Sequence, residues 1–431
     1  MPFETFAEPP RRIAVIGGGI SGLAAAHLLG QDHAVVVFEA EKRLGGHACT
    51  VMAGKRGDQP VDMGFIVFNR VNYPNLTRLF DKLEVPVADS TMSFGVSIGG
   101  GWLEYGLASV GALLAKRTNL LRLDYGRMLL DSLRFNGRAE QALCPGMTLR
   151  DLLAAVGTSD WFRDYYITPF SGAIWSTPVQ GILDFPAHPL VQFFKNHGLM
   201  AVKGQHQWET VKGRSVEYVR RLAGTLERHG VELRVGASVA GVRRADHGVM
   251  IRAEGGEWEV FDEVVFACHS DQALALLADA SPEERQSLAA IRYQRNDAVL
   301  HSDAGLMPRA KRAWSSWNYV EAAGARPEKI ALTYWMNSLQ PIPLDHPMFV
   351  TLNPVAPEDP RLVPEEERTF QHPVFDRGAM AAQARLWARN GDRATWFAGA
   401  WMRNGFHEDG VVSAMDVVAA MQARVKLREA A

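Results

Sequence analysis

The sequence predicts an α/β protein, in which a Rossmann-type lobe with a parallel sheet carries a second, inserted α+β lobe. Three observations favour this fold. A strand, a glycine-rich turn, a helix and a second strand follow one another within residues 13–39. Strand-like runs return at 231–277, and residues 395–420 read as a short apolar strand that leads into a helix. A chain of 431 residues is also long enough for two or three lobes.

The composition is that of an ordinary globular protein, with 47% hydrophobic and 22% charged residues. A formal net charge of -2 gives no electrostatic reason to expect a nucleic-acid partner. Cys49, Cys144 and Cys268 lie far apart and form no CxxC pair. Neither a disulfide framework nor a thiolate metal site is therefore expected, and a reducing cytoplasm is the expected location.

The N-terminal run imitates a targeting signal, because Arg11 and Arg12 precede an uncharged stretch at 13–30. Four glycines and His27 interrupt that stretch, which argues against a membrane span. The glycines fit a dinucleotide-binding turn better. Gly17 permits a tight turn, and Gly19 lets the backbone approach a pyrophosphate.

The helix after the turn supplies the remaining parts of that motif. Gly22 allows the helix to pack closely on the strand, while Ile20 and Ser21 belong to the helix N-terminus, whose free N–H groups favour a pyrophosphate. Glu39 ends the second strand 17 residues after the last glycine and is placed to accept hydrogen bonds from ribose hydroxyls. An acid at this point disfavours a 2′-phosphate. The alternative is an ordinary strand–helix turn.

The residues that follow, "AEKRLGGHA", resemble the second signature of the flavin-containing amine oxidoreductase superfamily, which includes amine oxidases, phytoene desaturases and protoporphyrinogen oxidases. This resemblance implies an FAD-binding lobe of the amine-oxidase and phytoene-desaturase type. It places Ala40 and Arg43 near the cofactor, with Arg43 beside the pyrophosphate, and Gly45 and Gly46 close under it. Relatives carry Arg where this chain has His47, which replaces a permanent cation by a titratable group.

The same resemblance extends along the chain. Residues 61–69, "VDMGFIVFN", resemble the segment beside the isoalloxazine ring, with Gly64 and Phe65 nearest to it. Val239 stands where relatives make a backbone contact to adenine. No cysteine follows Cys268, so a thioether from a C-terminal cysteine is excluded and FAD is expected to be bound non-covalently.

Near the C-terminus, relatives end the last strand with glycine and an acid that holds the ribityl or phosphate end of FAD. This chain supplies Gly399 but has Ala400 at the acidic position. Gly410, Val411 and Val412 match the start of the final helix. The free N–H groups there are expected to face the flavin and to stabilise negative charge on it.

Three titratable residues precede that helix start, and two interpretations remain open. In the first, His407 or Glu408 accepts the proton that accompanies hydride loss from a substrate. In the second, Asp409 caps the helix, Glu408 replaces the acid missing after Gly399, and His407 fills space. No second cluster with metal-ligand spacing accompanies them, so no metal site is expected.

The long middle segments are expected to form the substrate lobe. Their aromatic residues suit either an apolar substrate tunnel or an ordinary core. Residues 113–138 carry six basic and two acidic side chains among leucines at helical spacing. One interpretation is a helix in the membrane interface, peripheral at the inner membrane; the other is a solvated helix face. The expected lobes are 1–95, 205–277 and 391–431 for FAD, and 96–204 and 278–390 for the substrate.

Several local sequences resemble a bacterial subgroup of predicted FAD-dependent oxidoreductases related to a methyl-branched fatty-acyl desaturase of furan fatty acid formation. These are "FKNHGLM", "QWETVKGRS", "LHSDAGLMP", "SWNYV", "TLNP", "HPVFD" and "GFHEDG". Members of the subgroup are often linked with cyclopropane-fatty-acid-synthase-type methyltransferases. Arg214 departs from the pattern, because a glycine is expected there.

This second resemblance implies an activity. The expected reaction is dehydrogenation of an apolar chain by hydride transfer to FAD, with a methyl-branched unsaturated acyl group of a phospholipid as substrate and a methyltransferase as partner. The alternatives are a flavin amine oxidase, a non-redox FAD-dependent isomerase or mutase, and an FAD-bound scaffold that serves the methyltransferase.

Overall fold

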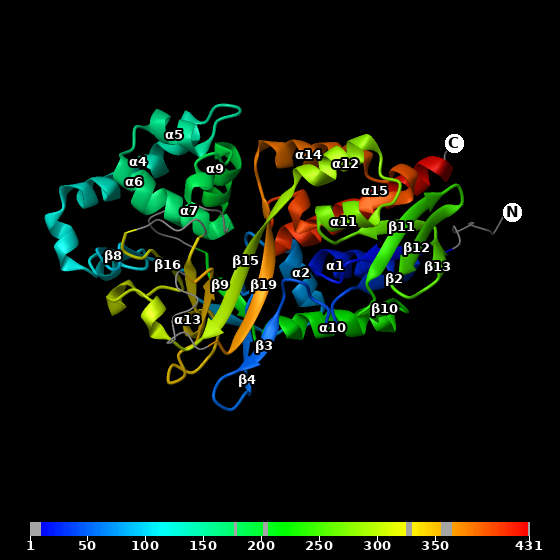
Figure 1. The fold of residues 1–431 in the computed structure, drawn as a ribbon, viewed down its shortest axis with the longest axis horizontal. Helices are drawn as coiled ribbons and strands as arrows, with labels where there is room; N and C mark the ends of the chain where they lie inside the picture. Colours follow the sequence, from blue (N-terminus) through cyan, green and yellow to red (C-terminus); the bar gives the residue numbers. More distant parts are fainter. Residues whose placement is uncertain (1–9, 176–178, 201–205, 325–329, 355–363, 430–431) are drawn as a thin grey trace.

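The computed structural model describes residues 10–175, 179–200, 206–324, 330–354 and 364–429. Two lobes lie side by side, and the described part of the chain begins and ends in the same lobe (Figure 1). We call this lobe the nucleotide lobe and the other the substrate lobe. Among the described residues no helix is both long and apolar enough to cross a bilayer.

The nucleotide lobe is built on a five-stranded parallel sheet with the strand order β10-β2-β1-β14-β20. The strands are β1 (Arg12–Ile16), β2 (Ala34–Glu39), β10 (Glu232–Val235), β14 (Glu263–Phe266) and β20 (Thr395–Phe397). The central strands are continuous apolar runs because both faces of the sheet are covered. The α/β class and the Rossmann-type sheet predicted from the sequence are confirmed.

Each face of this sheet has its own core. On one face, Val15 and Val37 pack with residues of three helices, α1 (Ile20–Leu29), α10 (Ser215–Arg228) and α15 (His407–Glu429). On the other face, Ile16 and Phe38 pack with the antiparallel meander of β11 (Val239–Ala245), β12 (Gly248–Ala253) and β13 (Trp258–Phe261). The alternation of inward and outward residues along β1 thus feeds two separate cores.

Two helices assigned by sequence to the substrate lobe pack on the nucleotide lobe instead. α12 (Pro282–Ala290) and α14 (Arg377–Arg389) bring Leu288 and Leu386 into the core of Ile16 and Phe38, beside α11 (Ser270–Leu276). All three helices lie over the nucleotide lobe in Figure 1. Both helices fall inside the range 278–390, so that segment begins and ends with nucleotide-lobe structure.

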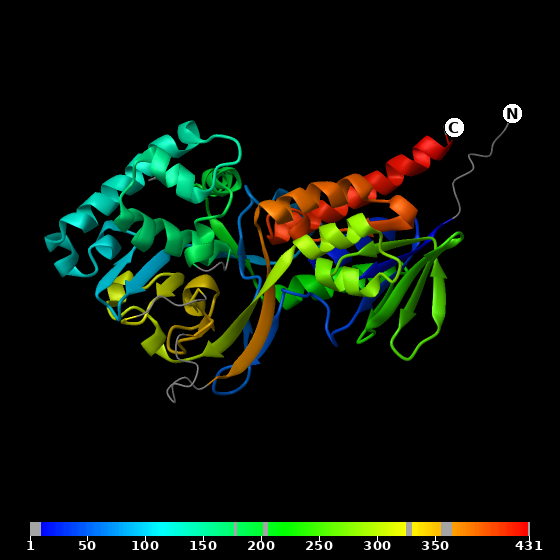
Figure 2. The ribbon, with the colours of Figure 1, turned by 45° about the horizontal axis from the view of Figure 1, so that its top comes forward.

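The substrate lobe contains a mixed seven-stranded sheet with the order β19-β15-β18-β17-β16-β7-β8. Its strands are β7 (Phe94–Ile98), β8 (Leu103–Gly106), β15 (Arg292–His301), β16 (Trp317–Val320), β17 (Leu332–Trp335), β18 (Phe349–Leu352) and β19 (Glu366–Val374). The two longest, β15 and β19, pair antiparallel and run between the lobes (Figure 2). They connect the sheet to α12 and α14.

Helices pack against this sheet. They are α3 (Val110–Leu113), α4 (Leu123–Ala142), α5 (Leu149–Val156), α6 (Asp160–Phe162), α7 (Thr168–Trp175), α8 (Val179–Ile182) and α9 (Ala187–Asn196). The short α13 (Met336–Leu339) lies apart from them, against β17 and β18. α2 (Pro74–Lys82) packs beside α15, and two small antiparallel sheets complete the fold. Their strands are β3 (Thr50–Ala53) and β4 (Gln59–Asp62), then β5 (Val67–Phe68), β6 (Val87–Ser90) and β9 (Trp208–Val211).

Candidate functional site

The glycine turn after β1 has the geometry that its sequence predicts. Gly17 adopts φ +112°, and its N–H donates to the Phe38 carbonyl at 2.8 Å. A Cβ on Gly22 would lie 1.8 Å from the Gly17 carbonyl oxygen, so only glycine lets α1 start this close to the turn. A Cβ on Gly19 would meet nothing within 4 Å, which leaves open space beside the backbone at the N-terminus of α1.

Glu39 is fixed at the end of β2 by two backbone donors. Its Oε2 accepts from the Gly18 N–H at 2.7 Å, and its Oε1 accepts from the Glu41 N–H at 2.8 Å. Each carboxylate oxygen keeps a further lone pair that can accept a hydroxyl hydrogen. The carboxylate therefore suits the ribose-binding role predicted for it.

The second glycine pair lies against the first turn. The Gly45 N–H donates to the Gly18 carbonyl at 2.8 Å, and Gly45 adopts φ +112°. A Cβ on Gly46 would lie 3.2 Å from the Cα of Gly19. Two backbone segments from different parts of the motif thus approach each other with no side chain between them.

Arg43 holds this second loop in place. Its guanidinium donates to the carbonyl oxygens of Gly46 at 2.9 Å and Ala48 at 3.1 Å, and it forms an ion pair with Glu41 at 3.0 Å. The side chain still lines the cavity described next. Arg43 can therefore both brace the loop and present positive charge to a phosphate.

One cavity of about 1680 Å³ joins the first and the last parts of the chain. This volume exceeds the roughly 300–1,000 Å³ of most ligand pockets, so a dinucleotide and a second molecule fit together. Its lining includes most of the predicted cofactor residues, namely Gly17, Gly19, Ile20, Ser21, Glu39, Ala40, Arg43, Gly45, Gly46, His47, Gly64, Phe65, Val239 and Gly399. The predicted residues Gly22, Val411 and Val412 do not line it.

The final helix begins earlier than predicted. The Asp409 carboxylate accepts from the Phe406 N–H at 2.9 Å, so α15 starts at His407 rather than at Gly410. Its free N–H groups consequently belong to the residues before Gly410. Val411 and Val412 lie beyond the first turn, which corrects their assignment to the cofactor. Gly410 packs on α1, since a Cβ there would lie 2.8 Å from the Ser21 hydroxyl oxygen.

Glu408 points away from the cavity. Its carboxylate accepts from the backbone N–H groups of Asn75 at 3.0 Å and Leu76 at 2.9 Å, and from the Asn75 side-chain amide at 2.6 Å. It therefore stabilises the N-terminus of α2, where a negative charge is favourable. This position gives no support to the proton-acceptor role predicted for Glu408, nor to its replacing an acid beside Gly399.

His407 does line the cavity. Its ring stacks on Phe65 with centroids 3.8 Å apart, and its Nε2 lies 3.0 Å from the Tyr218 hydroxyl. Burial, followed by the charge of His47, lowers the pKa of His407 to about 3, so the imidazole is neutral at pH 7. A neutral imidazole on the cavity wall can exchange protons with a bound molecule.

Three further histidines gather at the nucleotide end of the cavity. The His47 ring lies 6.0 Å from that of His269 and 5.4 Å from that of His372. Burial is the main cause that lowers the pKa of His47 to about 4, of His269 to about 4 and of His372 to about 3. His47 is therefore neutral and does not replace the permanent charge of an arginine. Its buried Nε2 has no hydrogen-bond partner among the described residues, which fits a polar group of a bound cofactor.

The sequence prediction missed His269 and His372. His269 lies just past the carboxyl end of β14, where α/β sheets bind their ligands, and this position was the available signal. His372 lies on β19 in the substrate-lobe sheet, and only the pairing of β19 with β15 positions it. Arg214 stands where a glycine was expected. Its backbone adopts φ +77°, a conformation that favours glycine, and its guanidinium donates to the carbonyl oxygens of Pro60 and Pro341.

The other end of the cavity is an apolar chamber in the substrate lobe. Phe193 stacks on His197 at 3.7 Å and on Phe406 at 4.9 Å. The wall is completed by aromatic and aliphatic side chains, among them Leu113, Leu129, Tyr166, Phe170, Ile174, Trp175, Leu199, Trp208 and Tyr334. His197 was not predicted either. Burial lowers the pKa of His197 to about 4, so it too is neutral at pH 7.

Together, the fold and the cavity define a dinucleotide-binding protein with an apolar second chamber. Residues 20–300 match the family model of the flavin-containing amine oxidoreductases, well over half of the sequence. The chain belongs to this family. It is an FAD-dependent oxidoreductase, and the residues around the glycine turn fit FAD.

Known relatives agree with this assignment. The FAD-dependent oxidoreductase dbaF of Emericella nidulans is 36% identical over 118 residues, a match that spans 27% of this chain and 23% of that protein. Three solved structures share the fold at 17% identity: a putative protoporphyrinogen oxidase from Exiguobacterium sp. 255-15 (TM-score 0.69), a CLA-producing fatty acid isomerase from P. acnes (0.68) and a cyclohexylamine oxidase from Brevibacterium oxydans IH-35A (0.69). The matches to the protoporphyrinogen oxidase and the fatty acid isomerase each span 96% of this chain and 99% of the other chain. The match to the cyclohexylamine oxidase spans 97% of this chain and 100% of the other.

Proposed function

We propose that the enzyme desaturates an apolar chain, with a methyl-branched unsaturated fatty acyl group of a phospholipid as substrate. The chamber carries this proposal. Among the described residues that line the cavity, the only carboxylates are Glu39 and Glu41, and both belong to the nucleotide end. FAD, when bound, supplies the two-electron acceptor that such a reaction needs.

The chemistry of the wall favours a neutral substrate over a cationic one. An ammonium group that leaves water is best stabilised by a carboxylate, and no carboxylate of the described residues lines the chamber, whose two histidines are neutral at pH 7. An alkyl chain has no charge to desolvate, and its burial is favourable by about 25 cal/mol per Å² of apolar surface. The fatty acid isomerase of P. acnes supports the proposal, because its similar fold serves a fatty acid.

The type of acyl chain follows from bond strength. An allylic C–H is weak enough for a flavin to oxidise, whereas an unactivated alkane C–H generally is not. A methylated mono-unsaturated chain has such allylic positions. A methyltransferase that acts on unsaturated acyl groups is therefore the class of enzyme that would supply the substrate and act as partner.

Two neutral imidazoles on the chamber wall can accept the proton that desaturation releases. His197 has a defined tautomer: Nδ1 lies 2.9 Å from the Phe193 carbonyl oxygen, which only accepts, so Nδ1 carries the hydrogen and Nε2 keeps its lone pair. His407 serves equally if its Nε2–H donates to Tyr218, because Nδ1 is then unprotonated. Both lie near Phe406: the His197 ring is 6.2 Å from the Phe406 ring, and His407 is the next residue in the sequence.

An anaerobic titration tests the proposal. The purified holoenzyme is mixed with a methyl-branched mono-unsaturated phospholipid, the unbranched analogue or a panel of mono- and polyamines, and flavin absorbance is followed. We expect bleaching by the branched lipid and a product lighter by two hydrogens. Bleaching by an amine would instead show an amine oxidase. A lipid product of unchanged mass would show an isomerase or mutase, the second candidate that the P. acnes neighbour suggests.

A further inference from the structure

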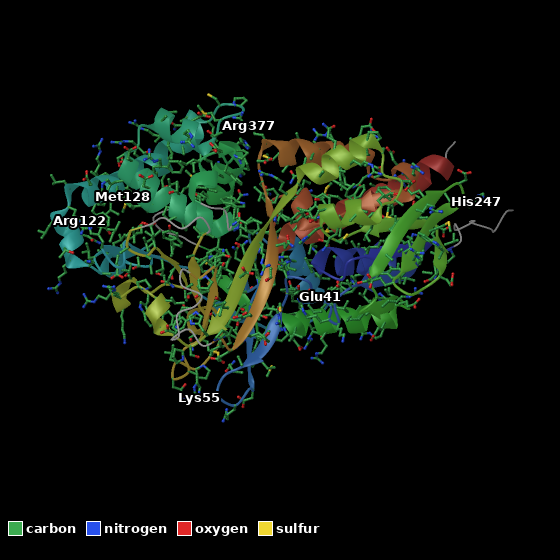
Figure 3. All side chains as sticks on the ribbon, viewed as in Figure 1. Glu41, Lys55, Arg122, Met128, His247 and Arg377 are labelled. Atoms are coloured by element: carbon green, nitrogen blue, oxygen red, sulfur yellow. The ribbon has the colours of Figure 1, made fainter. Side chains whose placement is uncertain are left out.

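The surface of the substrate lobe is unusually apolar around the start of α4. Within the described part of the chain, seven of the fifteen exposed large apolar side chains lie between residues 102 and 133. The most exposed are Leu121 and Leu123, at 85% and 92%. They flank Arg122 where the 3₁₀ turn Arg117–Leu121 passes into α4. Figure 3 shows Arg122 at one end of the molecule and His247 of the nucleotide lobe at the other.

Helical spacing makes this an amphipathic surface with a basic rim. Leu123, Arg127, Leu130 and Arg134 succeed one another at intervals of four, three and four residues, so they share one exposed face of α4. Arg138, four residues after Arg134, continues that face, and the exposed Arg117 lies in the 3₁₀ turn that precedes α4. Of the two acids between residues 113 and 138, the buried Asp131 forms an ion pair with Arg134, and Asp124 is exposed. The face still carries a net positive charge, because Arg127 and Arg138 are also exposed on it.

A tryptophan is braced beside the leucines. The Arg122 guanidinium lies 4.3 Å from the centre of the Trp102 ring, and Arg122 also donates to the Trp102 carbonyl at 3.1 Å. Lys116 donates to the Gly101 carbonyl of the same turn. An exposed tryptophan with neighbouring cations is the residue combination found at membrane–water interfaces.

The same helix also forms a wall of the chamber. Leu129, Ser132 and Asn136 line the cavity, and they lie on the face of α4 next to the exposed leucines. Leu133 belongs to both surfaces, since it lines the cavity and is 55% exposed. The chamber therefore meets the molecular surface beside the exposed apolar side chains.

We propose that the surface formed by Trp102, Val110, Leu120, Leu121, Leu123, Leu130 and Leu133 docks on an anionic phospholipid bilayer, with the basic side chains in the headgroup region. Charge complementarity favours this occupant, because the rim is cationic and phosphate headgroups are anionic. Docking would bring the mouth of the chamber to the hydrocarbon layer. An acyl chain could then enter without crossing water, a purpose that rests on the proposed function.

Vesicle flotation tests the docking without any turnover. The holoenzyme is mixed with vesicles of phosphatidylglycerol or of phosphatidylcholine, at low and high salt. We expect binding to the anionic vesicles that weakens at high salt. The double variant Leu121→Asp, Leu123→Asp should bind at least about tenfold more weakly, because two exposed leucine side chains that would enter the bilayer are replaced by anionic ones. Leu344→Asp is the matched control, since Leu344 is 74% exposed outside this surface, and it should bind like the wild type.

Three results would overturn the proposal. One is a wild-type protein that stays in the aqueous phase with both vesicles. Another is a double variant that floats as well as the wild type. The third is a wild-type dimer, measured by light scattering, that the double variant converts to a monomer, because a second copy of the chain would then cover the leucines. Activity on a soluble amine would disprove the proposed desaturation and leave the flotation result unaffected.

Discussion

Gly22 has less room for a side chain than any other glycine of the turn after β1. A Cβ there would lie 1.8 Å from the Gly17 carbonyl oxygen, which is backbone and cannot rotate away. We expect Gly22→Ala to displace the turn from α1 and to abolish FAD retention. The measurement is the ratio of flavin to protein absorbance after purification.

Gly224→Ala in α10 is the control for this substitution. A Cβ on Gly224 would meet only the end of the Arg228 side chain, at 3.6 Å. It should retain FAD and gain about 0.5–1 kcal/mol of stability, because alanine is the better helix residue. A Gly22→Ala protein that retains its full flavin content would refute the role given to this glycine.

His27 is a buried histidine of α1 whose two ring nitrogens have no hydrogen-bond partner among the described residues. Burial, together with the charges of Lys82 and His229, lowers the pKa of His27 to about 4. The unfolded chain, with an ordinary histidine pKa near 6.5, takes up a proton as the pH falls below 6.5, and the folded protein does so only near 4. The titration of His27 therefore does not reduce the free energy of unfolding above pH 6.5. As the pH falls from 6.5 toward 4, this residue makes the folded protein progressively less stable.

We expect His27→Leu to flatten this dependence. The wild type should lose about 2 kcal/mol from this residue between pH 7 and pH 5, at about 1.4 kcal/mol per pH unit below 6.5. The variant should also gain about 1 kcal/mol at pH 7, because two unpaired buried nitrogens are removed. Urea unfolding at the two pH values gives both quantities. His247→Leu controls for the loss of a histidine, since His247 is exposed in the turn between β11 and β12.

At the scale of elements, the N-terminus of α15 shows what local sequence can and cannot tell. The sequence located a helix start within a few residues and offered Asp409 as its cap, and the carboxylate does bind the N–H of Phe406. It could not assign Glu408, because the partner of Glu408 is the start of α2, more than 300 residues away in sequence. Only the packing of α2 beside α15 decides between a catalytic and a structural carboxylate.

Adjacent residues of α15 should therefore respond differently to substitution. Glu408→Ala removes acceptors from the N-terminus of α2 and should cost about 1–2 kcal/mol of stability, while the rate of flavin reduction by the lipid stays unchanged. His407→Gln should retain FAD and slow that reduction roughly a hundredfold if His407 is the proton acceptor. Urea unfolding and stopped-flow absorbance separate the two effects. An equal loss of rate in both variants would contradict the structural role of Glu408.

At the scale of the whole molecule, the sequence was most informative where the fold is local. The strand, turn and helix of residues 12–39 lie within one continuous motif, and glycine spacing alone indicated their geometry. His372 and His197 escaped prediction because they belong to separate segments of the substrate lobe that reach the cavity only after folding. The placement of α12 and α14 was missed for the same reason, since the two helices pack on each other in the core of Ile16 and Phe38, far from them in sequence.

The cavity has walls from residues 16–21 at one end of the sequence and from 399–407 near the other. During synthesis on the ribosome, the glycine turn leaves the exit tunnel long before β20 and α15 have been translated. For most of its translation, the nascent polypeptide thus exposes only the N-terminal wall of the FAD cavity. Because both parts of the chain line the cavity, we expect the coenzyme to load only after the last helix has formed, so riboflavin starvation should leave full-length protein without flavin.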